Sequence, residues 1–516
     1  MIADAPFVIK VTLACKPSYS EYNMPQSTKD TENASESVDM VIVGAGVSGI
    51  NAAYKLLTDF PSIQLTILEA RDDVGGTWDL FRYPGVRSDT PLPAYDFTWH
   101  PWFSPNPVAE GPLIKQYLKD CASQHGVTEH IRFQHKVLSA DWSQDAQKWT
   151  ITVSHRGLLI DITANFLVLG SGYYSYHTPF QTEIPGLENF KGDVINPQFW
   201  PDDYKHENKK MAVIGSGATA VSLFPAIVET ASQVTIVQRS PSYVVSTAHL
   251  GPPVSPLLEF LHVPPYTRYR LERLWITILH AITVVITTLF PTQSRAFIRN
   301  ITIPQLPKWC DHDVHFNPKY NPWDQRMCMC PDGDFFKALH KSNAGIVTGH
   351  IDTVTESSIK MQDGTVIDVD TIVTATGITM KLGGDIDISV NGKKMRWGDK
   401  LIWNGCMLDG VPNMIFIMGL TNYPWTICID ITIRIFLRLV RLMKSKGYKS
   451  AIPQLPKEGV LGTKRMWALD SSYSLQATSN LPKYGTTGPW KPRTWALIDE
   501  ITTRWSNITN GLKFTT

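Results

Sequence analysis

The chain has 516 residues, more than a single domain usually holds, so we expect two or three packed domains. Hydrophobic residues make up 43% and charged residues 18%, which is typical of a globular protein and excludes an extended disordered one. The 48 Lys and Arg residues nearly cancel the 47 Asp and Glu residues, and the net charge of +1 argues against a general attraction to nucleic acid.

Residues 1–37 are predicted to be a disordered N-terminal extension, because the stretch from Met24 to Ser37 is polar. The apolar stretch before it lacks a basic segment, so we expect no signal peptide, and Met24 is an equally sensible start. Seven scattered cysteines favour a reducing compartment, and we predict a cytoplasmic location. Cys328 and Cys330 lack the second pair that a zinc site needs, so no metal is expected.

The first glycine motif predicts a dinucleotide-binding fold. A β-branched run at 40–43 leads into GxGxxG, and apolar residues at helical spacing follow from Ile50 to Leu57. A second strand at 65–68 ends at Glu69, where a ribose-binding carboxylate is expected. The glycines that would let the backbone approach a pyrophosphate are Gly44, Gly46 and Gly49. We predict that this fold binds FAD.

The same pattern recurs after a strand at 210–214, here as GxGxxA, formed by Gly215, Gly217 and Ala220. The following strand, 234–237, ends in Gln238, Arg239 and Ser240 rather than in a carboxylate. A carboxylate would repel a 2′-phosphate, whereas a neutral amide beside a guanidinium and a hydroxyl would receive one. The second fold is therefore predicted to bind NADPH.

A third strand, 370–374, ends in the small residues Ala375, Thr376 and Gly377, as expected where backbone passes close to a cofactor. We assign this strand to the first domain. The predicted class is α/β, with two Rossmann-like dinucleotide-binding domains, the NADP domain being inserted into a split FAD domain. The expected ranges are 38–189 for the first FAD part, 190–345 for the NADP domain with a helical insert at about 250–325, and 346–516 for the second FAD part and C-terminal region.

At this point the sequence resembles the class B flavin monooxygenases of the Baeyer–Villiger type, from about Asp39 to Phe514. The blocks at 75–89, 320–328 and 331–339 are similar to the branch that activates ethionamide. The resemblance implies a flavin-embracing loop that includes Gly76, Thr77, Trp78 and Asp89. It also implies a linker fingerprint between the two nucleotide domains, formed by Phe190, Gly192, Asn196, Trp200 and Pro201.

The resemblance implies that NADPH reduces FAD, that the reduced flavin captures O₂ as a C4a-peroxide, and that one oxygen passes to the substrate. The catalytic cation falls on Arg326, and Asp89 corresponds to the carboxylate that holds it. A structural arginine in an ion pair is the alternative. Four aromatic residues in these blocks could wall the flavin pocket or pack in the core: Trp78, Trp200, Tyr320 and Trp323.

Asn196 stands where this family usually has histidine. Asparagine hydrogen-bonds but gains no proton near neutral pH, so proton-linked gating at the linker is in doubt. An asparagine that satisfies backbone groups is the equally weighted alternative.

Residues 274–290 carry no formal charge and lie between Arg273 and Pro291. A buried or docking helix, a surface that meets a membrane or an apolar substrate, and a true span all remain open. Membrane association at this segment is therefore an alternative to a purely cytoplasmic location. A helix expected from Ile427 to Lys446 carries basic residues at helical spacing, which we interpret as a solvated face.

Three functions remain in competition. The first is Baeyer–Villiger oxygenation of a small apolar ketone to an ester or lactone. The second is sulfur or nitrogen oxygenation by the same cofactors, and the third, from another class, is a nucleotide-binding protein without turnover. Substrate identity, regiochemistry, oligomeric state and pathway do not follow from the sequence.

Overall fold

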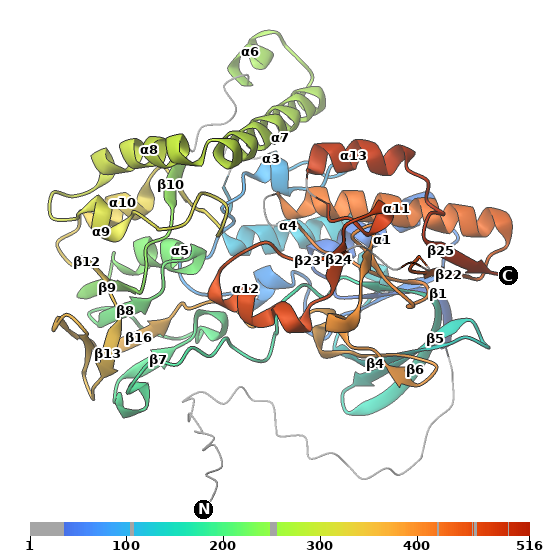
Figure 1. Ribbon diagram of the computed structural model, residues 1–516, viewed down its shortest axis with the longest axis horizontal. Helices are drawn as coiled ribbons and strands as arrows, with labels where there is room; N and C mark the ends of the chain where they lie inside the picture. The colour runs from blue at the N-terminus through green and yellow to red at the C-terminus, as the bar shows by residue number, and fades with distance from the viewer. Residues whose placement is uncertain are drawn as a thin grey trace, which may run out of the picture.

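The computed structural model describes residues 36–103, 108–247, 255–420, 423–456, 458, 462–493 and 495–516. The predicted N-terminal extension lies outside these ranges, apart from Glu36 and Ser37, which already belong to the first strand. The described residues form two large sheets, with helices packed against them, and several small sheets of two or three strands (Figure 1).

The first sheet is built around the motif predicted to bind FAD. Its path is β18 (Lys393–Lys394), β17 (Asp387–Val390), β4 (His135–Ser143), β5 (Lys148–His155), β6 (Leu158–Leu169), β1 (Glu36–Val43), β2 (Leu65–Leu68) and β3 (Ile131–Arg132), with β21 (Met414–Phe416) beside β6. The strands β6, β1 and β2 run parallel, while β4, β5 and β6 form an antiparallel meander. The helices α1 (Val47–Asp59), α4 (Gly111–Gln124) and α11 (Trp425–Lys446) bury their apolar faces in one core with this sheet.

The second sheet is entirely parallel, in the order β12 (Ala344–Thr348), β9 (Gln233–Gln238), β8 (Lys210–Ile214), β16 (Thr371–Thr374) and β7 (Asp193–Ile195). It packs with α5 (Ala218–Ile227) and α10 (Asp334–Leu339). Each sheet has parallel strands around a glycine motif, the first sheet being mixed and the second entirely parallel, and this arrangement confirms the predicted fold class.

The assignment of the strand at 370–374 was wrong. This strand, β16, pairs with β8 and β7 in the second sheet, so that sheet extends past the predicted boundary at 345. The strand that returns to the first sheet is β21, which pairs with β6. Both strands are short, apolar and buried, so local sequence could not reveal which sheet each would join.

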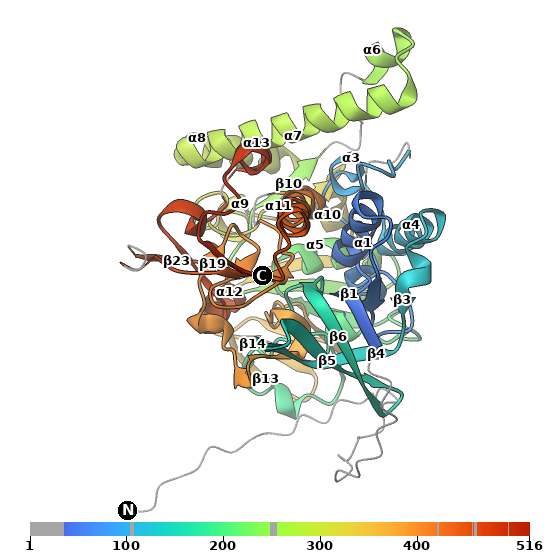
Figure 2. The ribbon, with the colours of Figure 1, turned by 90° about the vertical axis from the view of Figure 1, so that its right-hand side faces the viewer.

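A helical insert leaves the second domain between β10 (Val244–Thr247) and β11 (Cys328–Pro331). Its helices are α6 (Ser255–Phe260), α7 (Pro265–Leu289), α8 (Pro291–Thr302) and α9 (His312–His315). Figures 1 and 2 show α7 lying across the top of the molecule and over α3 (Leu92–Tyr95) of the first domain. The insert therefore reaches both domains.

The C-terminal region adds smaller elements. These are β13 (Ile351–Val354), β14 (Ser358–Met361), β15 (Val366–Asp368), β19 (Ile402–Trp403), β20 (Met407–Leu408), β22 (Ser450–Pro453), β23 (Thr463–Arg465), α12 (Ser472–Ala477), β24 (Lys483–Gly485), α13 (Ala496–Trp505) and β25 (Leu512–Thr515). The basic face predicted for the helix at 427–446 is not simply solvated. Arg434 pairs with Glu500 at 2.6 Å, and Arg438 donates to the Ser506 carbonyl at 2.6 Å, so both fasten α13 to α11.

Candidate active site

A cavity of about 1030 Å³ lies at the carboxyl ends of strands from both sheets. In parallel sheets this edge is where cofactors bind. It gathers predicted residues that are far apart in sequence: Gly46, Gly76, Thr77, Trp78, Asp89, Gly215, Gly217, Arg239, Ser240, Arg326, Ala375, Thr376 and Gly377. The remaining predicted residues lie outside its lining: Gly44, Gly49, Glu69, Ala220, Phe190, Gly192, Asn196, Trp200 and Pro201.

The glycines of the first motif allow the backbone of α1 to pack closely against the end of β1. A Cβ on Gly49 would lie 1.8 Å from the Gly44 carbonyl oxygen, and Gly44 itself has a φ of +95°. Helix α1 therefore starts tightly against β1. Its N-cap, Gly46, offers no side-chain cap, so the first amides of the helix are left for an anionic ligand.

Glu69 sits at the end of β2 and is buried, with 6% of its surface exposed. Its carboxylate accepts from the backbone amides of Ala45 at 2.7 Å and Arg71 at 2.9 Å. Burial raises the pKa of Glu69, although these two amides work against the rise. The carboxylate thus braces the glycine turn, and its contact with a ribose remains a prediction.

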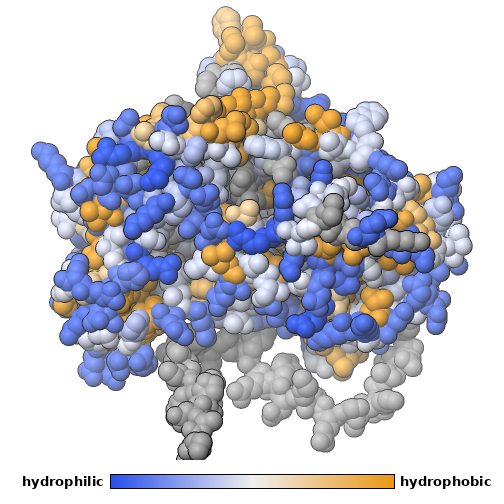
Figure 3. Space-filling model, in the orientation of Figure 1, coloured by the Kyte–Doolittle hydropathy of each residue, from blue (hydrophilic) through white to orange (hydrophobic). Residues whose placement is uncertain are grey.

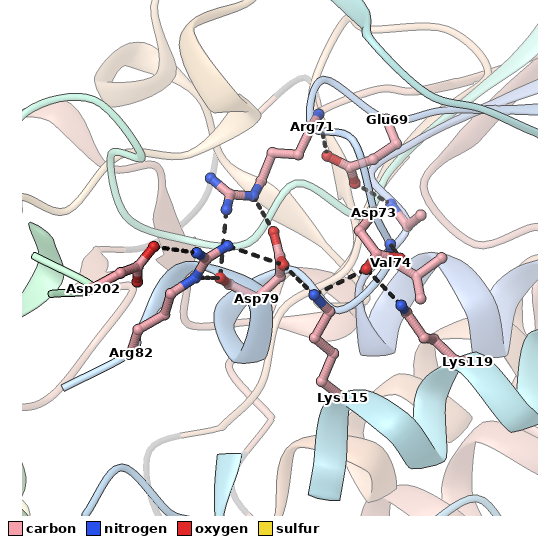
Figure 4. Close-up of polar contacts among 10 residues, drawn as sticks. Glu69, Arg71, Asp73, Val74, Asp79, Arg82, Lys115, Lys119 and Asp202 are labelled. Carbon is pink, nitrogen blue, oxygen red and sulfur yellow. Dashed lines mark hydrogen bonds and ion pairs between the residues drawn. The ribbon is translucent and has the colours of Figure 1, made fainter. Parts of the chain in front are cut away.

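A charged network lies under the loop that carries Gly76, Thr77 and Trp78 (Figure 4). Asp79, in α2 (Thr77–Leu80), has a side chain only 5% exposed and pairs with Arg71 at 2.5 Å and Lys115 at 2.6 Å. Arg82 donates to the Asp79 carbonyl at 3.1 Å and pairs with Asp202 at 2.9 Å. Since Asp202 directly follows the linker motif, the network ties the flavin-embracing loop to the linker.

The second glycine motif contacts the strand that the sequence had misassigned. A Cβ on Gly215, whose φ is +142°, would lie 2.2 Å from the Ala375 carbonyl oxygen. In contrast, a Cβ on Gly217 would meet nothing within 4 Å, because this glycine faces the cavity. The Ala375–Gly377 turn therefore belongs beside the second nucleotide site.

At the end of β9, Arg239 and Ser240 are exposed and line the cavity, whereas Gln238 is buried. The Gln238 side chain donates to the His315 carbonyl and to the Thr348 hydroxyl, each at 2.8 Å. Its amide therefore has internal partners and points away from the predicted 2′-phosphate. Gln238 would therefore favour a 2′-phosphate only because, unlike a carboxylate, it does not repel one.

Arg326 projects into the cavity at the end of a tight turn. Trp323 in this turn has a φ of +73° and donates its indole N–H to Thr287 of α7 at 2.8 Å. Burial works against the charge of Arg326, but the neighbouring Tyr173 and Asp89 outweigh it, so the pKa of Arg326 is raised. Asp89 lines the same cavity, but among the described side chains no ion pair joins it to Arg326 within 4.0 Å.

Asn196 acts as a local cap. Its side-chain oxygen accepts from the Gln198 amide at 3.0 Å, and its Nδ2 donates to the Thr374 hydroxyl at 3.5 Å. These contacts match the alternative in which the linker asparagine satisfies backbone groups. They also hold the linker against the end of β16.

The cavity also has an aromatic wall that no sequence motif predicted. Tyr173, Tyr174 and Tyr176 follow β6 and line the cavity together with Trp425 and Tyr473. The Trp425 ring stacks on that of Tyr173, with centroids 5.1 Å apart. Of the four aromatic candidates, only Trp78 lines it. The signal was present: Gly170-Ser-Gly172 ends a buried strand in small residues, as Ala375-Thr-Gly377 does.

Comparisons of sequence with known proteins agree on one family, and comparison with solved structures gives the fold. The flavin-binding monooxygenase-like family model matches residues 37–260. The chain is 39% identical to the FAD-containing monooxygenase EthA of Mycolicibacterium smegmatis, over 88% of this chain and 92% of EthA. It is 35% identical to the probable FAD-binding monooxygenase AlmA of Acinetobacter baylyi, over 92% and 95% of the two chains. Its fold matches OTEMO in complex with FAD and NADP, with a TM-score of 0.71, 21% identity and coverage of 93% and 99%.

Proposed function

The chain belongs to the flavin-binding monooxygenase-like family, and from this premise we propose that it oxygenates an apolar ketone to an ester or lactone. It is an FAD-containing, NADPH-dependent monooxygenase that consumes O₂. The observation that carries the ketone assignment is the shared cavity, where both nucleotide motifs meet the guanidinium of Arg326.

The residues present fit both cofactors. The uncapped start of α1 and the close packing of Gly44 and Gly49 suit the pyrophosphate of FAD, and the open face at Gly217 suits that of NADPH. Arg239 and Ser240 would hold the 2′-phosphate. Bound FAD supplies the redox chemistry: with two electrons from NADPH, one atom of O₂ enters the substrate and the other leaves as water.

Arg326 favours a ketone over a thioether or an amine. Insertion next to a carbonyl builds negative charge on the ketone oxygen in the transition state, and a fixed guanidinium stabilises such charge. Oxygenation of sulfur or nitrogen builds no comparable negative charge on the substrate. The aromatic wall suits an apolar substrate, because it offers large hydrophobic faces.

The enzyme works in the cytoplasm, with residues 274–290 in peripheral contact with a membrane. The region around this segment is held to the protein body: Arg273 pairs with Asp96 at 2.6 Å, and Thr287 accepts the indole N–H of Trp323. A helix fastened along its length to a folded domain lies on a bilayer rather than across it.

The test incubates the purified protein with NADPH, O₂ and a matched panel of ketones and thioethers of equal size. We expect a yellow protein that forms esters or lactones, identified by mass spectrometry, with one NADPH consumed per product. Sulfoxides without esters would overturn the ketone assignment. A colourless protein that consumes no NADPH would instead support the alternative of a nucleotide-binding protein without turnover.

A further inference from the structure

An unusual number of large apolar side chains are exposed on one side of the molecule. In α6 and α7 they include Phe260, which is 77% exposed, and Leu279, Ile282 and Ile286, which are 48 to 50% exposed. In α13 they recur at helical spacing as Ile498, Ile501 and Trp505, the last being 84% exposed. We call the exposed apolar faces of α6, α7 and α13 the apolar ridge. Patches of this extent are rare on proteins without a partner at that surface.

The ridge is convex. Figures 1 and 2 show α6 projecting from the body, with α7 below it and α13 on the same side. Figure 3 shows a continuous hydrophobic area over the projecting end. A convex apolar surface can enter a fluid lipid layer, whereas two convex copies of it would meet over only a small area.

The inward face of α7 buries Ala281 and Val284 and is also held to the first domain by polar contacts. Arg273 donates to the Pro93 carbonyl at 2.9 Å and pairs with buried Asp96, which also accepts from Tyr269 at 2.7 Å. Further along, the ring of His280 packs edge-on against Trp323 and Tyr423. The large apolar residues therefore face outward because the polar ones are committed inward, and the helix is amphipathic in the sense of a membrane-surface helix.

Charge identifies the kind of membrane. From Ser255 to Thr302 the chain carries five arginines and two glutamates. Three of the arginines pair with carboxylates, Arg268, Arg273 and Arg299, whereas Arg270 is exposed on α7. Two tryptophans, Trp275 and Trp505, are exposed beside the aliphatic residues, and tryptophan favours the boundary between headgroups and acyl chains. We infer that the apolar ridge docks on the surface of a negatively charged lipid bilayer, with the exposed Arg270 meeting anionic headgroups.

Docking would place the catalytic turn close to the lipid. Thr287 on α7 contacts Trp323, three residues before Arg326, and Tyr423, which packs on His280, lines the cavity. This consequence rests on the proposed function: an apolar ketone dissolved in the bilayer would be supplied at the cavity side that α7 covers.

The test mixes the full-length, FAD-loaded protein with vesicles of phosphatidylcholine alone or with added phosphatidylglycerol, and measures cosedimentation. We expect binding to the anionic vesicles that weakens in high salt. The variant L279E/I286E should bind about 100-fold more weakly, since each substitution removes an exposed aliphatic side chain that docking would bury in the bilayer. The matched control is L158E/L159E, which changes two leucines of 68% and 64% exposure on β6, away from the ridge.

Absorbance of bound FAD and the melting temperature show that each variant is folded. Failure of the unaltered protein to bind anionic vesicles overturns the proposal, as does equal binding by L279E/I286E or equal loss in the control. A dimer in sedimentation that only L279E/I286E dissociates, without vesicle binding, would instead assign the ridge to a second copy. Turnover of a water-soluble ketone without vesicles is measured in parallel, so a failed docking test and a failed catalytic function remain distinguishable.

Discussion

At the scale of single residues, two adjacent residues that were predicted for the same phosphate site lie in different surroundings. Gln238 and Arg239 are adjacent, yet the first is buried with two internal acceptors and the second is exposed in the cavity. Asn196 caps its own turn, so its departure from the family histidine has a local structural explanation. Arg326 and Asp89 share a cavity but no ion pair among the described residues, so Asp89 acts on Arg326 through the electrostatic field.

Arg239→Ala should remove most of the preference for NADPH over NADH. A charge-assisted contact with the 2′-phosphate contributes about 1.5 to 3 kcal/mol, which is more than tenfold in affinity. Steady-state kinetics with both nucleotides would measure the ratio of kcat/KM. Lys205→Ala, which changes an exposed cation outside the cavity lining, is the control. An unchanged ratio in Arg239→Ala would place the 2′-phosphate elsewhere.

Arg326→Ala should keep FAD and flavin reduction but lose about 10² to 10³ in product formation, the usual cost of removing a preorganised donor. Arg326→Lys should restore activity only in part, because lysine lacks the planar fork. Asp89→Asn should lower product formation less, since it removes a negative charge near Arg326 but breaks no ion pair. Stopped-flow reduction and product yield separate these steps. Near-normal ester formation by Arg326→Ala would show that another group stabilises the charge.

At the scale of elements, each strand, glycine turn and helix forms one nucleotide-binding unit, but the two units tolerate change differently. In the first, Gly49 packs on the backbone of Gly44, which joins α1 closely to β1. In the second, Gly215 packs on Ala375, and Gly217 leaves space that opens into the cavity. The space beside Gly49 is thus occupied by protein backbone, whereas the space beside Gly217 is open to a ligand.

Gly49→Ala should give a colourless or unstable protein, because the added Cβ would lie 1.8 Å from a carbonyl oxygen that cannot move without unseating α1. Gly217→Ala adds a Cβ that meets nothing within 4 Å, so it should fold and retain FAD while its KM for NADPH rises. Flavin content per chain and circular dichroism would measure both. Full FAD occupancy in folded Gly49→Ala would contradict the assignment of this turn.

At the scale of the whole molecule, the helical insert ties the two domains together. Arg273 comes from the insert of the second domain and Asp96 from the first, and their side chains are 12% and 0% exposed. Burial raises the pKa of Asp96 to about 6, against the opposing influence of Arg273. Since this folded pKa exceeds the unfolded value, the contribution of Asp96 to stability is present below about pH 4 and is lost as pH rises through about 6.

Arg273→Met should therefore destabilise the protein most at high pH. Near pH 8 it leaves a buried carboxylate without its cation, at a cost of about 3 to 5 kcal/mol. Without Arg273 the pKa of Asp96 rises further, so near pH 5 the carboxyl is protonated and the loss is smaller. Urea denaturation at both pH values would measure the difference. The exposed pair Arg299 and Asp313 supplies the control, since Arg299→Met should change stability little at either pH. Equal destabilisation by Arg273→Met at both values would contradict the account.

The sequence by itself determined the two nucleotide folds, and its motif blocks pointed to the family. These follow from local signals: glycines before a helix, apolar strands of four or five residues, and a carboxylate or arginine at a fixed strand end. The tertiary structure decided what depends on partners distant in the chain. It placed the strand at Thr371–Thr374 in the second sheet, turned Gln238 inward, and brought Tyr173, Trp425 and Tyr473 to one cavity.

The orientation of α7 shows the physical reason. The uncharged composition of 274–290 predicted an apolar helix but not which way it faces, because a buried helix and a surface helix can share a composition. Contacts with residues distant in sequence set the side of α7 that faces the protein. Arg273 contacts Asp96, 177 residues away, and Thr287 contacts Trp323, 36 residues away. Once those polar groups were satisfied inside, the apolar side had to face out, an outcome that no local pattern encodes.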